Sequence, residues 1–237
     1  MPPDLRKVGN MTFCQSQSPL GAPVNLCDIS FWVANHADAR VQSARFLPYL
    51  TIGGYEVAKM KLYSICPDLV VTSDKRRFRL HGAMRGAWSV VMFHPEAFTP
   101  VCSTEIVRLS ELRADSGIGL RVFSVVPDKL SRTQSWIAQL NAQTKTGVHH
   151  DCIADRDGEM RQAFGFSKEA VAEATLRGYY IFDPELRLRS FTVLPKQIGF
   201  SSDEVLRVVT ALCLSDSSGD LAPVDWQPGL KMLKVDA

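Results

Sequence analysis

Short apolar runs alternate with amphipathic stretches from residue 62 onward, a pattern typical of an α/β domain. Residues 101–112 and 131–143 repeat their apolar positions at helical spacing, so each is expected to form a helix, the first beginning around Cys102. Strand-sized apolar runs surround these helices, at residues 78–81, 88–93, 120–126 and 151–155. This order of strands and helices predicts parallel pairing in the first part of the sheet.

The later part of the chain predicts antiparallel pairing. Residues 178–182 and 188–194 flank a turn at residues 183–185, where an aspartate followed by a proline favours a hairpin. A brief helix is expected to end near Gly165, and a longer one to begin around Ser201, where a capping side chain precedes acidic residues. Together these elements predict a mixed central sheet flanked by helices.

Composition and charge narrow the class of protein. The 237 residues are 46% hydrophobic and 22% charged, which fits one medium globular domain with or without an appendage. A net charge of +2 gives no electrostatic reason to expect a nucleic acid or an anionic membrane as partner. No apolar run approaches the roughly 20 residues of a membrane-spanning helix. The N-terminal stretch lacks the apolar core of a secretory signal, so a cytoplasmic location is expected.

The cysteines are scattered, at positions 14, 27, 66, 102, 152 and 213. Without a CxxC pair, neither a disulfide scaffold, nor a structural zinc site, nor a dithiol centre is expected, and the thiols should be reduced. Residues 149–152 form the one cluster with metal-ligand chemistry, but only His150 and Cys152 share a strand face. Two ligands are too few for a site, so no metal is predicted.

The segment FHPEAFTPVCSTE, residues 93–105, places Cys102 in the first turn of a helix that follows a buried strand. Unpaired N–H groups and the helix dipole stabilise a thiolate at such a position. Thr99 offers a hydroxyl near the sulfur, and Pro95 and Pro100 stiffen the loop. The alternative is that Cys102 is a buried helix-cap thiol with a packing role, the commoner fate of a single cysteine.

This segment resembles the peroxiredoxins of the alkyl hydroperoxide reductase/thiol-specific antioxidant superfamily, specifically the one-cysteine, peroxiredoxin 6-like branch, whose signature reads very nearly HPxxFTPVCTTE. The likeness continues in CPD at 66–68, IADRDGEMRQAFG at 153–165, TLRGYYIFDP at 175–184, DEVLRVVTAL at 203–212 and PVDWQPG at 223–229. The resemblance implies a thioredoxin-like fold.

The resemblance also implies roles for individual residues. Cys102 is similar to the peroxidatic nucleophile, Thr99 to its hydrogen-bonding neighbour and Pro95 to the residue that shields it. Arg177 matches the arginine of the family pattern, and Glu105 is expected to orient it. A guanidinium beside a thiolate favours ionisation and offers donors to peroxide oxygens. The alternative for Arg177 is a charge on the surface of a strand.

The implied activity is that of a thiol-dependent peroxidase, which reduces hydrogen peroxide and small alkyl hydroperoxides through a cysteine sulfenic acid. An external thiol of the thioredoxin, glutaredoxin or glutathione type closes the cycle, no cofactor is needed, and a homodimer or a ring of dimers is expected. Two-cysteine members usually carry a second, resolving cysteine at the position that Ala222 occupies in this sequence. Cys213 is either a resolving cysteine toward a partner subunit or, as we favour, a helix residue packed on the core.

Two other functions use the same residues. A peroxide-sensing or chaperone-like redox protein on the same scaffold is the main alternative. A disulfide reductase is the weaker one, because no second cysteine stands close after Cys102.

The resemblance begins near Met60 and divides the chain. Residues 60–237 are expected to form the peroxiredoxin domain with a C-terminal dimerisation tail, and residues 1–59 an N-terminal extension of uncertain structure. One interpretation of the extension is a cover over a face of the oligomer. The favoured one is that translation begins at Met60, because residues 53–57 are compatible with a purine-rich ribosome-binding stretch.

Overall fold

The computed structural model describes residues 51–52, 55–56, 60–115, 117–166 and 176–235. The predicted extension, residues 1–59, lies almost entirely outside them. Among the described residues, no helix has both the length and the apolar character needed to cross a membrane.

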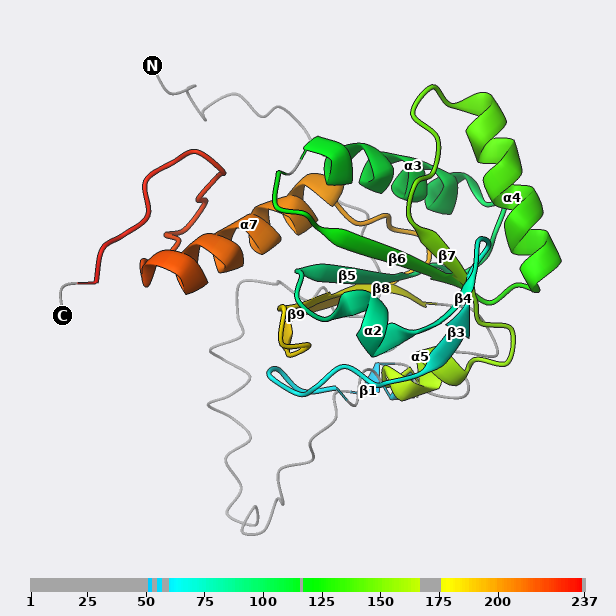
Figure 1. The fold of residues 1–237 in the computed structure, drawn as a ribbon, viewed down its shortest axis with the longest axis horizontal. Coiled ribbons are helices and arrows are strands. Elements are labelled where there is room, and N and C mark those ends of the chain that lie inside the picture. The colour runs from blue at the N-terminus through cyan, green and yellow to red at the C-terminus, as the bar shows by residue number, and fades with distance from the viewer. Residues whose placement is uncertain (1–50, 53–54, 57–59, 116, 167–175, 236–237) are drawn as a thin grey trace, which may run out of the picture. The chain divides into compact units, whose positions relative to one another are not determined.

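A five-stranded mixed sheet forms the centre of the domain (Figure 1). Its strands, in spatial order, are β7 (Asp151–Ala154), β6 (Arg121–Val126), β5 (Ser89–Phe93), β8 (Leu176–Phe182) and β9 (Leu188–Pro195). The first three are parallel, whereas β8 runs antiparallel to β5 and β9 antiparallel to β8. The predicted change from parallel to antiparallel pairing is confirmed.

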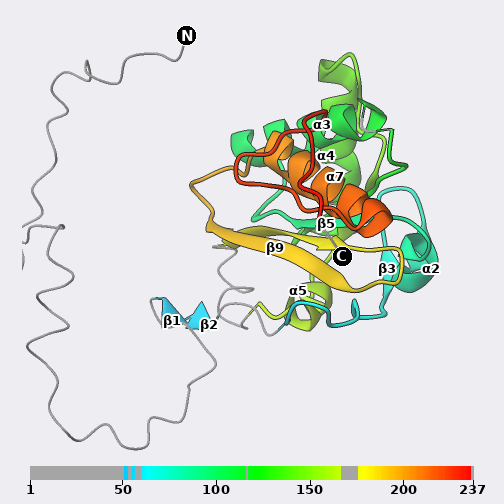
Figure 2. The ribbon, with the colours of Figure 1, turned by 90° about the vertical axis from the view of Figure 1, so that its left-hand side faces the viewer.

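Helices cover both faces of this sheet (Figures 1 and 2). One face carries α3 (Pro100–Asp115), α4 (Leu130–Gln143) and α7 (Ser202–Ser218), and the other carries α2 (Leu80–Met84) and α5 (Glu159–Ala163). Alternate residues of β5 serve the two faces: Val90 and Met92 pack toward α3 and α7, while Val91 and Phe93 pack toward α2 and α5. The predicted thioredoxin-like arrangement of a mixed sheet between helices is confirmed.

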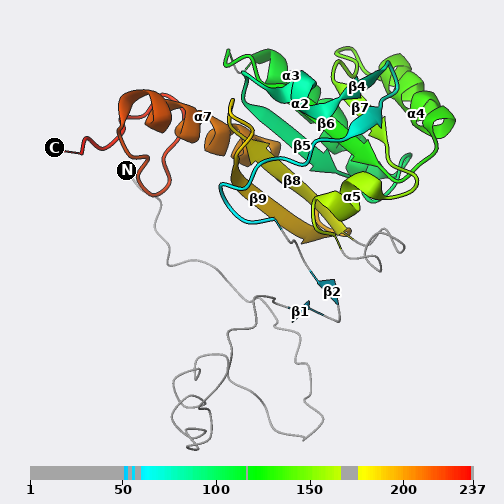
Figure 3. The same ribbon diagram turned by 60° about the horizontal axis from the view of Figure 1, so that its bottom comes forward.

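Local signals account for the ends of several elements. The Ser201 side chain accepts a hydrogen bond from the Glu204 N–H at 3.2 Å and caps α7. In the β8–β9 hairpin, Asp183 Oδ1 accepts hydrogen bonds from the N–H groups of Glu185 and Arg187, at 3.1 and 2.8 Å. The antiparallel strands of this hairpin lie side by side in Figure 3. Both the cap and the turn had been predicted from these residues.

The strand predicted at residues 78–81 is wrong in its second half. A short strand, β4 (Arg77–Arg79), pairs with β3 (Val70–Thr72), and the chain turns into α2 at Leu80. Leu80 and Met84 are fully buried one helical turn apart, and the N–H of His81 donates to Asp68 Oδ1 at 3.2 Å. Helical spacing thus buries both apolar side chains while Asp68 satisfies a free N–H at the helix start.

The helix expected to begin around Cys102 begins at Pro100 instead. Proline suits the first position of a helix, because its missing N–H has no helical acceptor there and its fixed φ is helical. Cys102 is therefore the third helical residue and remains in the first turn.

A two-stranded antiparallel pair, β1 (Thr51–Ile52) and β2 (Tyr55–Glu56), precedes the domain. At the other end, the segment after α7 folds back beside that helix (Figures 1 and 2). There Trp226 is 1% exposed, and its carbonyl accepts a hydrogen bond from Arg207 of α7 at 3.3 Å.

Candidate active site

The loop between β5 and α3 places Cys102 beyond the carboxyl end of β5, the middle strand of the sheet. The His94 N–H donates to the Val125 carbonyl at 2.9 Å, and the Ala97 N–H donates to Asp128 Oδ2 at 2.8 Å. Pro95 lies between these two anchors and is buried, and its shielding role stays a prediction. Phe98 takes a positive φ of 65°, an uncommon conformation for a residue with a side chain. The loop is therefore held on both sides before the helix begins.

Cys102 is 0% exposed and belongs to an apolar cluster with Ile106, Val126 and Trp136. Burial raises the pKa of its thiol, but hydrogen bonds from His94, Thr99 and the main chain at Glu96 more than offset this, so the pKa is lowered. The buried thiols of Cys66 and Cys152 differ, because burial raises the pKa of each. Cys102 is thus the buried cysteine whose surroundings favour the thiolate.

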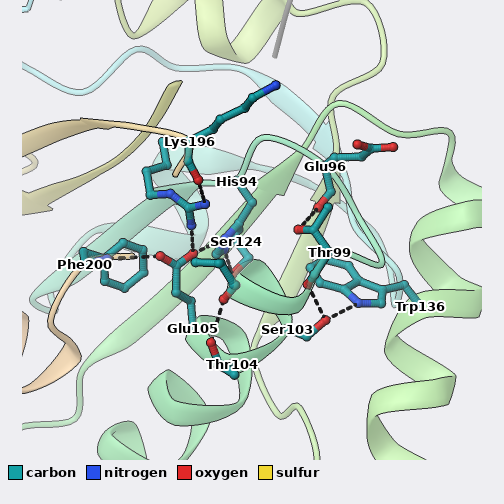
Figure 4. A network of polar contacts seen from close by, with 12 residues as sticks. His94, Glu96, Thr99, Ser103, Thr104, Glu105, Ser124, Trp136, Lys196 and Phe200 are labelled. Atoms are coloured by element: carbon teal, nitrogen blue, oxygen red, sulfur yellow. Dashed lines mark hydrogen bonds and ion pairs between the residues drawn. The ribbon is translucent and has the colours of Figure 1, made fainter. Parts of the chain in front are cut away.

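Thr99 is one of the residues whose hydrogen bonds lower the pKa of the Cys102 thiol. Its Oγ1 is also within hydrogen-bonding distance, 3.1 Å, of the Glu96 carbonyl. The carbonyl of Thr99 accepts a hydrogen bond from Ser103 Oγ at 2.8 Å, and Ser103 Oγ accepts one from Trp136 Nε1 at 3.1 Å. This chain of contacts ties the first turn of α3 to α4 (Figure 4).

His94 is a residue of the site that sequence reasoning missed. It follows β5 directly and is 1% exposed, with Nδ1 at 3.1 Å from Glu105 Oε2 and Nε2 at 3.2 Å from Ser124 Oγ. Burial lowers the pKa of this imidazole, but hydrogen bonds to Cys102 and Glu105 outweigh burial and raise it. Its position at the end of a predicted strand, immediately before Pro95, was the signal available in the sequence.

Arg177 and Glu105 form a buried ion pair, with 2.5 Å between Nη1 and Oε2. Arg177 is 2% exposed, so the alternative of a surface strand charge is wrong. The other Glu105 oxygen accepts a hydrogen bond from the Phe200 N–H at 3.1 Å, and Arg177 Nη2 donates to the Lys196 carbonyl. The structure therefore connects Arg177 to Cys102 by way of Glu105 and His94.

One nitrogen atom of the Arg177 guanidinium is left unused. Within the described part of the chain, the Nε atom of Arg177 is buried and has no hydrogen-bond partner. A buried, unused N–H on a cation is a donor available to an oxygen-bearing ligand.

Three side chains of this site have metal-ligand chemistry, since one ligand atom each of His94, Cys102 and Glu105 lies within 4.8 Å of the other two. The donor set does not fit a metal ion. Both oxygens of Glu105 already accept hydrogen bonds, and a cation bound there would face the Arg177 guanidinium.

The cluster predicted at residues 149–152 turns its side chains to different partners. Asp151 pairs with Arg76 at 3.0 Å, Cys152 lies in the apolar cluster of Cys102, and His150 bonds Ser124 at 2.9 Å. The expectation of no metal stays a prediction.

Cys213 is partly buried on α7 and packs against an apolar cluster that includes Val205 and Val209. Cys66, Cys102, Cys152 and Cys213, the cysteines in the described ranges, are free thiols. A resolving role for Cys213 stays a prediction.

Comparison with known proteins places these features in a family. Residues 63–191 match the model of the AhpC/TSA family. A peroxiredoxin of Archaeoglobus fulgidus is 31% identical over 164 residues, which cover 68% of this chain and 75% of that relative. A thioredoxin peroxidase of Trypanosoma brucei rhodesiense is 32% identical over 157 residues, covering 64% of this chain and 77% of the relative.

Solved structures agree on the fold. The yeast mitochondrial 1-Cys peroxiredoxin superposes with a TM-score of 0.66 at 22% identity, covering 73% of this chain and 85% of the other. A mutant of peroxiredoxin 6 of Arenicola marina gives a TM-score of 0.65 at 24% identity, covering 74% of this chain and 84% of the other. With the motif, the fold and the family match in agreement, the chain belongs to the AhpC/TSA family, the peroxiredoxins, and is a thiol-dependent peroxidase.

Proposed function

We propose that this protein reduces hydrogen peroxide and small alkyl hydroperoxides through Cys102 in a one-cysteine cycle. The observation that carries the proposal is the set of hydrogen bonds from His94, Thr99 and the main chain at Glu96, which lower the pKa of a buried thiol. A thiolate is the nucleophilic form of cysteine, and a lowered pKa increases its fraction at neutral pH.

In the first step, the Cys102 thiolate attacks the terminal peroxide oxygen. An S–O bond forms as the O–O bond breaks, and the departing oxygen takes a proton and leaves as water or an alcohol. Solvent supplies that proton, while the charge of His94 beside Cys102 supports the attacking thiolate. Arg177 supports the site through Glu105, and its unused Nε donor suits the charge that develops on oxygen. The product on the enzyme is a sulfenic acid.

In the second step, an external thiol reduces the sulfenic acid. Its sulfur attacks the Cys102 sulfur and releases water, and a second thiol then cleaves the mixed disulfide. Ala222 stands where two-cysteine members usually carry their resolving cysteine, and Cys213 packs against the core on α7. Both observations support a reductant that comes from outside the protein. We propose a thiol of the thioredoxin, glutaredoxin or glutathione type, and a cytoplasmic setting, where such thiols are kept reduced.

We also propose that residues 60–237 assemble as a homodimer or a ring of dimers through the C-terminal tail. That tail exposes several apolar side chains, Leu221, Val224, Leu230 and Leu233. Light scattering during size-exclusion chromatography tests this, because a monomeric mass that persists at high concentration contradicts it.

The experiment that tests the chemistry is a peroxide titration followed by intact-mass spectrometry, with Cys102→Ser and Cys213→Ser as variants. A single added oxygen that requires Cys102 and is unaffected by Cys213→Ser supports the one-cysteine cycle. A disulfide-linked species that disappears in either variant makes Cys213 the resolving cysteine. No fast oxidation at Cys102 rejects the proposal.

A peroxide sensor or redox chaperone on the same scaffold is the alternative. Steady-state turnover that depends on a thiol reductant favours the enzyme. Stoichiometric oxidation accompanied by a change of assembly favours the sensor.

A further inference from the structure

A buried chain of hydrogen bonds leads away from the active site to a second histidine. His94 follows β5, Ser124 lies in the neighbouring strand β6, and His150 directly precedes β7. The Nε2 atom of His94 is 3.2 Å from Ser124 Oγ, and Ser124 Oγ is 2.9 Å from Nε2 of His150. Ser124 is 0% exposed and His150 3%, so water is kept from the link (Figure 4 shows its first half).

The far side of His150 is also held. Its Nδ1 is 2.9 Å from Ser110 Oγ, which accepts a hydrogen bond from the His149 N–H at 3.4 Å. The carbonyl of His150 accepts a hydrogen bond from Lys75 Nζ at 2.5 Å. Among the described residues, the charged and titratable groups around the two rings include Cys102, Glu105 and Arg177 near His94, and Lys75, His149 and the pair Arg76–Asp151 near His150.

The positions of the protons in this chain are coupled. Nδ1 of His94 faces the Glu105 carboxylate, which only accepts, so Nδ1 carries a proton. Whether His94 is charged then depends on Nε2, whose partner Ser124 has one hydroxyl proton to share between two imidazoles.

Two arrangements of the protons satisfy the contacts that join His94, Ser124 and His150. When His94 is an imidazolium, Nε2–H donates to Ser124 and the serine proton goes to Nε2 of His150. When His94 is neutral, the serine proton goes to His94 instead, and His150 must donate its own Nε2–H. An accepting Nε2 on His150 therefore favours the charged form of His94.

We propose that His150 is a positioning residue for the chemistry at Cys102: acting through Ser124, it holds His94 in the protonated form that supports the thiolate. This inference rests on the proposed role of Cys102 as the reacting thiol. It assigns a function to a buried side chain at the start of β7, two strands away from the strand that leads into the active-site loop.

Two substitutions of His150 by an amide distinguish a role through the hydrogen bond to Ser124 from a role in packing alone. In His150→Gln the amide extends to the place of Nε2 and keeps an acceptor for Ser124. In His150→Asn the shorter amide stays near Nδ1, keeps the contact with Ser110 and loses the contact with Ser124. Both introduce a buried amide of similar polarity, so they form a matched pair, and His149→Asn serves as the neighbouring control.

The measurement is the rate at which iodoacetamide alkylates Cys102 across pH, read from the Cys102 peptide by mass spectrometry. We expect His150→Asn and Ser124→Ala to raise the pKa of Cys102 by about one unit, slowing alkylation about tenfold at pH values below it. His150→Gln and His149→Asn should match the wild type. Because His150 acts through Ser124, the double variant Ser124→Ala with His150→Asn should show no further shift than Ser124→Ala.

The proposal is overturned if the His150→Asn profile superimposes on that of the wild type, if Gln and Asn shift it equally, or if the double variant adds a second full shift. Thermal unfolding of each variant identifies any that fails to fold, in which case Ser124→Ala against wild type decides. Alkylation does not require peroxide, so the pKa of Cys102 can still be measured if the wild type fails to react with peroxide. The role of His150 and the proposed peroxidase chemistry can therefore fail separately.

Discussion

The guanidinium of Arg177 and the carboxylate of Glu105 meet at 2.5 Å inside the protein, joining β8 to α3 across 72 residues of sequence. The same carboxylate oxygen accepts a hydrogen bond from His94 at 3.1 Å. The Glu105 side chain thus holds together a strand, a helix and His94, which lies beside Cys102. The ion pair serves both the stability of the fold and the electrostatics of the site.

Breaking this pair should destabilise the protein. Glu105→Gln leaves a buried guanidinium without its counter-charge, which typically costs about 3–5 kcal/mol of unfolding free energy. Urea denaturation measures the loss. Glu111→Gln is the matched control, because Glu111 pairs with Arg108 on the surface and should cost less than about 1 kcal/mol. Equal losses in the two variants contradict the importance of the buried pair.

A double variant tests whether the two charges act as a unit. Glu105→Gln combined with Arg177→Met removes both members, so no uncompensated charge stays buried. The loss in the double variant should be smaller than the sum of the two single losses. Additive losses would mean that the two side chains stabilise the fold independently.

The reaction of Cys102 with peroxide should depend on pH in a defined direction. Burial raises the pKa of its thiol, but hydrogen bonds, the largest of them from His94, lower the pKa by more than burial raises it. The thiolate therefore persists to a lower pH than that of an ordinary cysteine. The rate should fall as pH drops through this pKa, because protonation removes the nucleophile. In His94→Leu the fall should move to higher pH, and the reaction at low pH should be about tenfold slower if the pKa of Cys102 rises by about one. Rapid-mixing kinetics over a pH series measures the curves of both proteins. Coincident curves would contradict the role of His94 in lowering the pKa of Cys102.

The Thr99 hydroxyl should contribute to thiol reactivity. Its hydrogen bond helps to lower the pKa of Cys102, and a hydrogen bond to a charged group is typically worth about 1.5–3 kcal/mol. Thr99→Val should therefore slow peroxide reaction about tenfold, while Thr99→Ser retains most of the rate. Thr104→Val is the control, because the exposed Thr104 hydroxyl donates to the Val101 carbonyl instead. A Thr99→Val protein as fast as Thr104→Val would contradict the role.

Gly178 should tolerate no side chain, because a Cβ there lies 2.8 Å from the Thr192 carbonyl of β9. Gly178→Ala must push β9 away beside Arg177, and overpacking of this kind costs about 1–3 kcal/mol. At Gly82, inside α2, an added Cβ meets nothing within 4 Å. Gly82→Ala should therefore be neutral or stabilise by about 0.5–1 kcal/mol. Thermal unfolding compares the two, and an unchanged melting temperature for Gly178→Ala would contradict the close approach.

Periodicity, turns and caps were readable from the sequence because they are local properties. The spacing of apolar residues predicted the order of strands and helices, and Asp183 and Ser201 marked a turn and a helix start whose contacts the structure confirms. The same reasoning placed Cys102 in a first helical turn, and the motif around it led to the family. Residues 78–81 were misjudged because burial against the sheet, rather than local propensity, selects the helix that begins at Leu80.

Tertiary structure alone decided which polar side chains reach the reactive thiol. His94, Ser124 and His150 lie in or beside three separate apolar runs, and nothing in those runs indicates that they share partners. The order of β5, β6 and β7 brings them together, although 30 residues separate His94 from Ser124 and 26 separate Ser124 from His150. The sequence by itself predicted most of the elements, the family and Cys102 as the candidate nucleophile. Only the packed sheet determined which polar groups surround Cys102, because buried hydrogen bonds depend on which distant donors and acceptors the fold leaves facing one another.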